Sequence, residues 1–232
     1  MSKERPLVLF EPPEPNKRRL ELTRLWDRRR FLTGVGLGAA AFMVPGAYAN
    51  ALEKTPRQTE GPFFPDNLPL DTDNDLVILG DSLTPAVGAV THLSGTVRDL
   101  TGKVVPGALV ELWQVDGNGV YMHSQAPKEN QDKHFQGYGR FLTDRHGRYY
   151  FRTVKPVPYP GRTPHIHAAI SIKGRRVLTT QCYIMGEALN KRDGIYRNMS
   201  KAQQDLVTAA FNPIGGDPNG QLQATWDIFI KP

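Results

Sequence analysis

Two histidine residues two positions apart are the strongest chemical signal in the sequence. His165 and His167 occur in Pro164-His165-Ile166-His167 and lead into the apolar run 168–172. Side chains two residues apart on a β-strand point to the same face, so both imidazoles can converge on one point. Paired imidazoles suit zinc, copper, iron or nickel. Taken alone, the pair could equally be two ordinary strand histidines, one packed and one hydrogen-bonded.

Two tyrosines stand where glycines and prolines constrain the backbone. Tyr159 lies in the proline-rich turn 155–160, and Arg162 stands between it and the histidines. The prolines fix the backbone on both sides of Tyr159, which lets a loop deliver its side chain to a defined place. Tyr121 follows the glycine turn 117–119. No carboxylate stands beside the histidines as a two-histidine, one-carboxylate iron(II) site requires, so the tyrosines are the further ligands that the chain offers.

Short alternating runs separated by turn residues must position these side chains. Such a pattern predicts an all-β fold with a β-sandwich or barrel core. The expected strands are 75–79, 92–99, 108–115, 148–153, 165–173, 177–184 and 224–230.

One short C-terminal helix is expected beside these strands. Ser200 is a candidate N-cap with Gln203 three residues later, and the helix should run through 205–211 before Asn212-Pro213. The polar segments 122–136 and 187–199 fit no strand. We expect them to be long loops that carry or cover a site.

The sequence resembles a known family, the intradiol ring-cleavage dioxygenases, and it is most similar to the protocatechuate 3,4-dioxygenase kind. The resemblance runs from residue 93 to residue 187, about half of the chain beyond residue 49, with its segments in one order and at consistent spacing. Thr59-Glu60-Gly61-Pro62-Phe63 extends it upstream. The segments are 95–97, 110–114, Gly119-Val120-Tyr121-Met122-His123, 137–144, 147–153, Lys155-Pro156-Val157-Pro158-Tyr159-Pro160 and Arg162-Thr163-Pro164-His165-Ile166-His167.

The resemblance implies a non-haem Fe(III) site. Its ligands would be Tyr121, Tyr159, His165 and His167, with Tyr159 and His167 axial and the other two equatorial beside a hydroxide. Two phenolates and one hydroxide would balance the three charges of the ion in a buried site.

The implied reaction is O2-dependent cleavage of a catechol-type ring between its two hydroxylated carbons, giving a muconate-type diacid without an external reductant. Arg162 would stabilise negative charge on the activated ring, and Tyr159 could accept a substrate proton. Gln181 matches a position that hydrogen-bonds the substrate or a metal-bound oxygen.

Two departures from the family leave the substrate open. Gly161 and Cys182 stand where the protocatechuate enzymes carry larger residues, so both should reshape the cavity. The well-studied enzymes also pair two different chains around one site. This chain has one complete ligand set, so it could act as a homo-oligomer or need a second subunit.

The N-terminal region predicts export. Residues 1–49 carry a formal +4 of the chain's +6, which argues against a nucleic-acid-binding surface in residues 50–232. Asp27-Arg28-Arg29-Arg30-Phe31-Leu32 and the Gly/Ala-rich stretch 34–49 resemble a twin-arginine signal peptide. We therefore expect a disordered N-terminus and a signal peptide within 1–49, a catalytic β-sandwich domain at 50–232, and a periplasmic or extracellular enzyme without a stable membrane span. An uncleaved leader acting as a tether is the lesser alternative.

Two other interpretations remain at this stage. Segments 94–99 and 106–111 also resemble small β-sandwich modules that bind or adhere and catalyse nothing, although such a module needs no Tyr-Tyr-His-His set. The second alternative keeps the site but loads another metal, such as copper.

Overall fold

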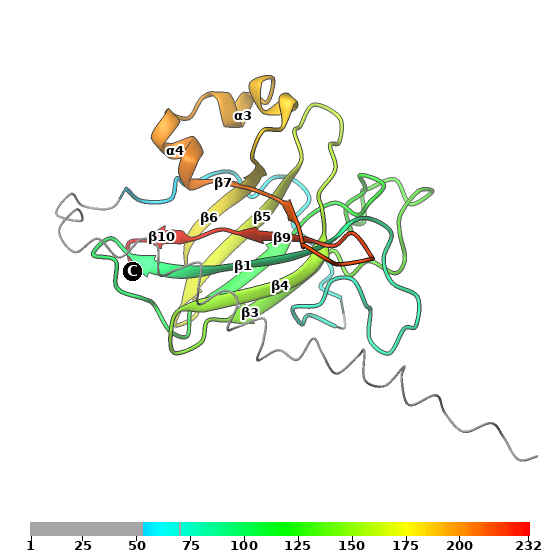
Figure 1. The fold of residues 1–232 in the computed structure, drawn as a ribbon, viewed down its shortest axis with the longest axis horizontal. Coiled ribbons are helices and arrows are strands. Elements are labelled where there is room, and N and C mark those ends of the chain that lie inside the picture. The colour runs from blue at the N-terminus through cyan, green and yellow to red at the C-terminus, as the bar shows by residue number, and fades with distance from the viewer. Residues whose placement is uncertain (1–52, 70) are drawn as a thin grey trace, which may run out of the picture. The chain divides into compact units, whose positions relative to one another are not determined.

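Two five-stranded sheets face each other across one apolar core in the computed structural model, which describes residues 53–69 and 71–232 (Figure 1). In the first sheet β1 pairs with β4, β9 and β10, and β9 pairs in turn with β8. The second sheet has the order β3-β2-β5-β6-β7. The expected β-sandwich is therefore confirmed. The expected leader and the boundary at residues 49 and 50 lie outside the described residues.

The first sheet is built around β1 (Val90–Asp99), whose side chains alternate between buried and partly exposed. This period of two lets Leu93 and Val97 enter the core while their neighbours face outward. β4 (Arg148–Val154) pairs antiparallel with β1. β9 (Leu222–Thr225) and β10 (Ile228–Ile230) pair in parallel with successive halves of the same strand, and β8 (Asn212–Pro213) adds to β9.

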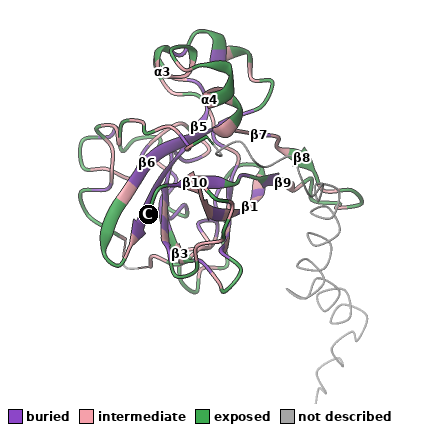
Figure 2. Cartoon of the chain, turned by 90° about the vertical axis from the view of Figure 1, so that its left-hand side faces the viewer, coloured by how far each residue is buried: buried purple, intermediate pink, exposed green. Residues whose placement is uncertain are grey.

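The second sheet carries the candidate site. β5 (His165–Ile172) lies between β2 (Leu109–Trp113) and β6 (Arg175–Ile184) and is buried along almost its whole length. Figure 2 shows that β6 is buried along its C-terminal part and exposed at its start. The edges of the sheet are β3 (Tyr138–Leu142) and β7 (Thr208–Ala209). β5 is therefore a strand with two buried faces, one toward the core and one toward the site.

Several strands differ from the expectation. β3 was not predicted, whereas Asp75 makes one isolated bridge with Arg152 and the expected strand 75–79 does not form. The Asp75 carboxylate accepts hydrogen bonds from the Val77 and Ile78 backbone N–H groups, which folds this segment into a turn. The expected strand 224–230 is divided into β9 and β10.

The helical region also differs from the expectation. α4 (Lys201–Leu206) begins at Ser200 with the predicted capping box, but it ends before 211 because Thr208 pairs with Tyr183 as strand β7. The segment 187–199, expected as a loop, contains the 3-10 helix η2 (Ala188–Lys191) and α3 (Gly194–Arg197). The expectation of a single short helix is therefore wrong. No helix in the described part of the chain is long and apolar enough to cross a membrane.

Candidate metal centre and catalytic site

The two histidines lie on the face of β5 that points away from the core. Ile166, Ala168 and Ile170 alternate with them and enter the core of the sandwich. The strand register places His167 beside Trp113 of β2 and Gln181 of β6. The alternation that buries the apolar residues on one face therefore gathers the polar side chains on the other.

Tyr121 reaches the histidines from the loop after β2. The Asp116 carboxylate accepts hydrogen bonds from the backbone N–H groups of Asn118 and Val120, at 2.9 Å each. Gly119 adopts a φ of 82°, which favours glycine at this point of the turn. The turn is thus held from within, and it fixes the start of the segment that carries Tyr121.

Three side-chain atoms that can each offer a lone pair to a metal lie close together. Tyr121 Oη lies 3.1 Å from His167 Nε2 and 3.4 Å from His165 Nε2, and the two Nε2 atoms are 3.1 Å apart. All three side chains are buried. Two ligand atoms at roughly 2.1 Å from one cation and at right angles to each other lie about 3.0 Å apart, so this spacing fits a shared metal ion.

The protonation chemistry fits a cation as well. His165 Nδ1 lies 2.7 Å from the Thr163 carbonyl oxygen, which can only accept, so the proton sits on Nδ1 and Nε2 offers a lone pair. Burial, together with the nearby Arg162 charge, lowers the pKa of His165 to about 4, so the ring is neutral at neutral pH. Burial likewise lowers the pKa of His167 and raises that of Tyr121. His167 Nδ1 has no hydrogen-bond partner among the described residues, and a cation on Nε2 would leave the proton there.

Tyr159 lies next to this cluster and faces a cavity. Its ring centroid is 5.4 Å from that of Tyr121 and 5.6 Å from that of His165. The Arg162 backbone N–H donates to the Tyr159 carbonyl oxygen at 3.0 Å, closing a turn through Gly161, whose φ is 81°. Tyr159 is only partly buried, whereas Tyr121 is 4% exposed. Of the two tyrosines, only Tyr159 lines the cavity.

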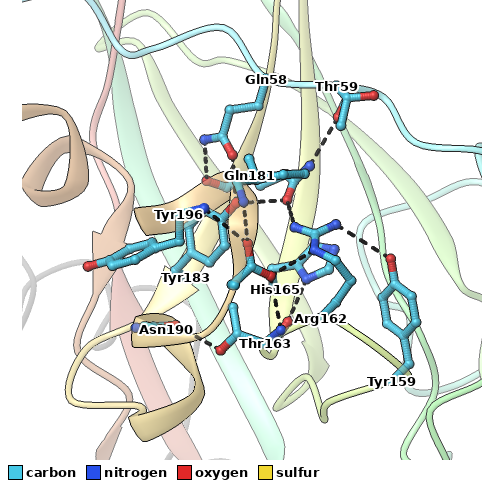
Figure 3. A network of polar contacts seen from close by, with 12 residues as sticks. Gln58, Thr59, Tyr159, Arg162, Thr163, His165, Gln181, Tyr183, Asn190 and Tyr196 are labelled. Atoms are coloured by element: carbon cyan, nitrogen blue, oxygen red, sulfur yellow. Dashed lines mark hydrogen bonds and ion pairs between the residues drawn. The ribbon is translucent and has the colours of Figure 1, made fainter. Parts of the chain in front are cut away.

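Arg162 is held at three of its nitrogen atoms. Nε donates to Asp193 Oδ2 at 2.7 Å, Nη2 to Gln181 Oε1 at 2.6 Å, and Nη1 to Tyr159 Oη at 3.5 Å. Figure 3 shows the guanidinium between Gln181 and Tyr159. Burial alone would lower the pKa of Arg162, but the hydrogen bond and charge of Asp193 outweigh it and raise the pKa. The side chain is therefore a fixed positive charge beside the cluster.

Asp193 organises this part of the site from outside the strands. Its fully buried carboxylate also accepts from the backbone N–H of Thr163 at 3.1 Å, and it caps α3 through the N–H groups of Ile195 and Tyr196. Burial alone would raise its pKa, yet these hydrogen bonds and Arg162 hold the pKa below the ordinary value. One carboxylate therefore ties α3 to the loop that carries Arg162.

Gln181 is anchored as firmly as Arg162. Its Nε2 donates to the Thr59 carbonyl oxygen at 3.1 Å, and its Oε1 also accepts from the Tyr183 hydroxyl at 2.9 Å. The same Tyr183 hydroxyl lies 2.7 Å from Gln58 Oε1, so its single proton is shared between the two amide oxygens. The segment around Gln58 and Thr59 thus closes the network from the N-terminal side (Figure 3).

Aromatic rings enclose the cluster formed by Tyr121, His165 and His167. Trp113 stacks on His167 with centroids 4.9 Å apart and an interplanar angle of 9°, and Phe63 stacks on Tyr121 at 5.1 Å. Gly61 covers His167, because a Cβ built on Gly61 would lie 3.3 Å from His167 Cε1. The cluster is therefore shielded from water on these sides, which strengthens electrostatic interactions within it.

The structure brings together all six residues expected from the sequence: Tyr121, Tyr159, Arg162, His165, His167 and Gln181. Asp193 and Trp113 were missed as parts of the site. Asp193 is a residue type that commonly caps helices, so it could have indicated the start of α3. No local pattern indicates that the same carboxylate binds Arg162. Trp113 was assigned only to the end of a strand, although strand pairing places it beside His167.

A cavity of about 280 Å³ opens between the loop 158–163 and the segment 189–193. Gly161 lines this cavity, so the absence of a larger side chain at this position can affect the shape of the cavity. The expectation for Cys182 is wrong, because this residue is fully buried in the core and does not line the cavity. Gln181 faces the site, so its neighbour on the strand must face the opposite side of the sheet.

The polar side chains beside the two imidazoles are tyrosines rather than further histidines or carboxylates. No group of three or more His, Cys, Asp or Glu side chains that could hold a metal is present among residues 53–69 and 71–232. The chain places Tyr121 and Tyr159 beside the two imidazoles, so phenolic oxygens are the further groups available to a cation there.

Comparison with known proteins identifies the family of this chain. The dioxygenase family model, Dioxygenase_C, matches residues 59–232. The chain is 30% identical to the hydroxyquinol 1,2-dioxygenase of Rhodococcus opacus over 82% of its own length and 64% of that enzyme, so it spans less than two thirds of that relative. It is 34% identical to the protocatechuate 3,4-dioxygenase beta chain of Burkholderia cepacia, covering 68% of this chain and 72% of the other.

A solved structure shows the same architecture. The dioxygenase domain of a dioxygenase and carbohydrate-binding protein fusion from Streptomyces sp. SirexAA-E has a TM-score of 0.59 and 29% identity, over 76% of this chain and 97% of the other. These matches give no support to the alternative of a non-catalytic binding module. The family model covers the strands and loops that carry Tyr121, Tyr159, His165 and His167, and the chain belongs to the intradiol ring-cleaving dioxygenase family.

Proposed function

We propose that this protein is a non-haem Fe(III) dioxygenase that cleaves a catechol-type aromatic between its two hydroxylated carbons. Both atoms of O2 would enter the product, a muconate-type diacid, so the overall reaction balances without a reductant. The observation that carries the proposal is the convergence of Tyr121 Oη, His165 Nε2 and His167 Nε2 within 3.1–3.4 Å of one another.

The proposed ligands are Tyr121, Tyr159, His165 and His167. Two neutral imidazoles and two phenolates suit a trivalent ion better than a divalent one, because the phenolates cancel two charges and a hydroxide cancels the third. Burial raises the pKa of Tyr121 well above 10.0, so only a cation at this point would keep its phenolate charged at neutral pH. Ferric iron bound there supplies a Lewis acid that withdraws electron density from a catechol.

Tyr159 is the ligand we expect to exchange with the substrate. It lines the cavity and is partly exposed, whereas Tyr121, His165 and His167 are buried behind it. A phenolate released at the cavity can accept a proton from a catechol hydroxyl, with the proton ending on Tyr159 Oη. The location of this side chain thus suits both roles.

Arg162 would stabilise negative charge on the ring, and Gln181 would hydrogen-bond the substrate or a metal-bound oxygen. The guanidinium is already fixed by Asp193 and Gln181, so it needs no reorganisation when negative charge develops beside it. Arg162 also lines the cavity next to Tyr159. This preorganisation favours catalysis over simple binding.

The proposal is tested with purified protein by metal analysis, a visible spectrum and oxygen uptake. We expect one iron per chain, a broad tyrosinate-to-iron charge-transfer band, and oxygen uptake with catechol, protocatechuate or hydroxyquinol. The band should weaken or vanish in Tyr121→Phe and Tyr159→Phe. Iron binding and an unchanged band in both variants would show that the ligand assignment is wrong, and copper in place of iron would favour the other metal.

We propose in addition that the enzyme is exported by the twin-arginine route, on the strength of Arg28-Arg29-Arg30-Phe31-Leu32 and the stretch 34–49. The expected result is folded enzyme outside the cytoplasm and its retention inside when Arg28 and Arg29 are both replaced by Lys. Export that is unaffected by this double substitution would contradict the route. The oligomeric state is measured on the same purified material.

A further inference from the structure

A short segment, residues 60–64, lies over two of the proposed metal ligands. Gly61 packs on His167, because a Cβ built on Gly61 would lie 3.3 Å from His167 Cε1. Phe63 stacks on Tyr121 with ring centroids 5.1 Å apart. We call residues 60–64 the covering segment, since it separates this side of the ligand cluster from solvent.

The chain is hydrogen-bonded to the sheet just before the covering segment. The backbone N–H of Gln58 donates to the Thr179 carbonyl oxygen at 2.9 Å, and the Thr59 carbonyl oxygen accepts from Gln181 Nε2 at 3.1 Å. Within the covering segment, no backbone group bonds to the sheet in the described part of the chain, and only Glu60 has a polar side chain. The covering segment is therefore held by packing and by whatever binds Glu60.

Arg176 of β6 binds Glu60 and contacts the covering segment at its other end as well. Its Nη1 donates to Glu60 Oε1 at 3.0 Å, and its Nη2 donates to Glu111 Oε2 at 3.1 Å. The guanidinium carbon also lies 5.1 Å from the centroid of the Phe64 ring, which is a cation–π contact. One side chain thus ties both ends of the covering segment to the sheet.

A β-bulge explains why Arg176 faces the covering segment. Val177 is an extra residue on β6, at the point where the pairing of β6 with β5 shifts register. Without it, regular alternation would place Arg176 on the face of Leu178, which lies in the core. The extra residue turns Arg176 to the opposite face, where Gln181 and the other side chains of the site lie.

Two carboxylates share the positive charge of Arg176. Glu111 is 12% exposed and also accepts from Tyr138 Oη at 2.7 Å, so its position on β2 is fixed. The Glu60 side chain is 40% exposed and belongs to no strand or helix. Loss of the guanidinium would leave two like charges facing each other, and Glu60 is the one that can move away.

We propose that Arg176 is a positioning residue for the metal centre, which fastens the covering segment over Tyr121 and His167 and so slows the exchange of the bound ion. Arg176 acts through Glu60 and Phe64, and it does not line the cavity. This inference rests on the proposed function in one respect, namely that the cluster holds a metal ion.

Hydrogen exchange tests the fastening without metal or turnover. The peptide to follow contains the N–H groups of Gln58 and Gly61, both of which are hydrogen-bonded. Purified wild type is compared with Arg176→Gln and with the control Arg152→Gln, which loses a pair of similar exposure with Asp75 in the other sheet. We expect roughly ten-fold faster exchange in Arg176→Gln alone, as befits one ion pair and one cation–π contact.

Iron release tests the consequence for the metal. Iron-loaded protein is mixed with an excess of a coloured ferric chelator, and the rate of release is followed. We expect release to be roughly ten-fold faster in Arg176→Gln and less accelerated in Arg176→Lys, whose ammonium keeps the charge but not the paired contacts. Glu60→Gln changes an exposed side chain and should also accelerate release, so it serves if Arg176→Gln does not fold.

The double variant Arg176→Gln/Glu60→Gln gives the sharpest result. It should release iron no faster than Arg176→Gln alone, because the repulsion between the two carboxylates is gone. Multiplied effects of the two substitutions would overturn the proposal.

The remaining outcomes separate this inference from the proposed function. Faster exchange in Arg176→Gln of a protein that binds no iron would contradict the proposed function and retain the fastening of the covering segment. Bound iron with a tyrosinate band, together with equal exchange and release rates in Arg176→Gln and Arg152→Gln, would overturn the role of Arg176 and leave the proposed function intact.

Discussion

The buried cluster of Tyr121, His165 and His167 and the cavity wall that carries Arg162 are held in place by different means. Tyr121, His165 and His167 are fixed by strand pairing, a tight turn and stacked rings, with few polar contacts beyond the cluster itself. Arg162 is instead held by charge-assisted hydrogen bonds to a helix cap and a neighbouring strand. We infer that the cluster holds one metal ion. The wall instead places the positive charge of Arg162 beside the part of the substrate on which negative charge develops during the reaction.

Removing a cluster residue should have the largest effect. We expect His167→Ala to lose iron and turnover together, with an affinity loss beyond the roughly 100-fold seen when only a supporting contact is removed. The measurement is iron per chain after dialysis against a weak chelator. A variant that retains iron and the visible band would place the metal elsewhere.

Removing the fixed charge of the wall should leave the ion in place. Arg162→Leu should lower kcat by about 10²–10³-fold, the usual effect of losing one preorganised charge donor, while iron content stays near that of wild type. Steady-state kinetics and metal analysis on the same sample check this. Loss of iron equal to that of His167→Ala would mean that the two regions are not separate.

Weakening the support of Arg162 should have an intermediate effect. In Asp193→Asn the amide oxygen can still cap α3, but the charged partner of Arg162 is gone, and we expect kcat to fall roughly ten-fold with little change in iron content. The control for loss of a carboxylate partner of an arginine is Asp144→Asn, which removes the charge that faces Arg148 in a more exposed pair away from the site. Similar kinetic losses in both variants would argue against a positioning role for Asp193.

A change on the core face of β5 should have the smallest effect on the site. Ile170 is fully buried, and Ile170→Val should lower the free energy of unfolding by about 0.5–1.5 kcal/mol. Denaturant unfolding measures this cost, and the visible band serves as the control. A shifted band would show that the two faces of the strand are coupled.

The residues that lie together in the cluster were easier to predict from the sequence than the partners in the wall, for physical reasons. Strand alternation is a local signal, so β5 and the common face of its histidines were readable. β3 was missed because Gly139 interrupts its apolar pattern. That glycine is needed where the chain approaches Asp73, since a Cβ there would lie 2.5 Å from the Asp73 carbonyl oxygen.

The wall depends on contacts between residues far apart in the sequence. α3 is only four residues long, and the carboxylate that caps it also binds Arg162, 31 residues away. Cys182 was placed at the cavity from a family position, whereas strand alternation turns it into the core. Local patterns therefore indicated the chemistry of the ligands better than the partners that position the charge.

The central claim is that one ferric ion is held between Tyr121, Tyr159, His165 and His167. The most direct measurement is a crystal structure of the iron-loaded protein with anomalous data collected on both sides of the iron absorption edge. The account predicts one iron peak within bonding distance of Tyr121 Oη, His165 Nε2 and His167 Nε2, with Tyr159 Oη as a further ligand. An iron peak away from these atoms, or a fully loaded protein with no peak among them, would contradict it.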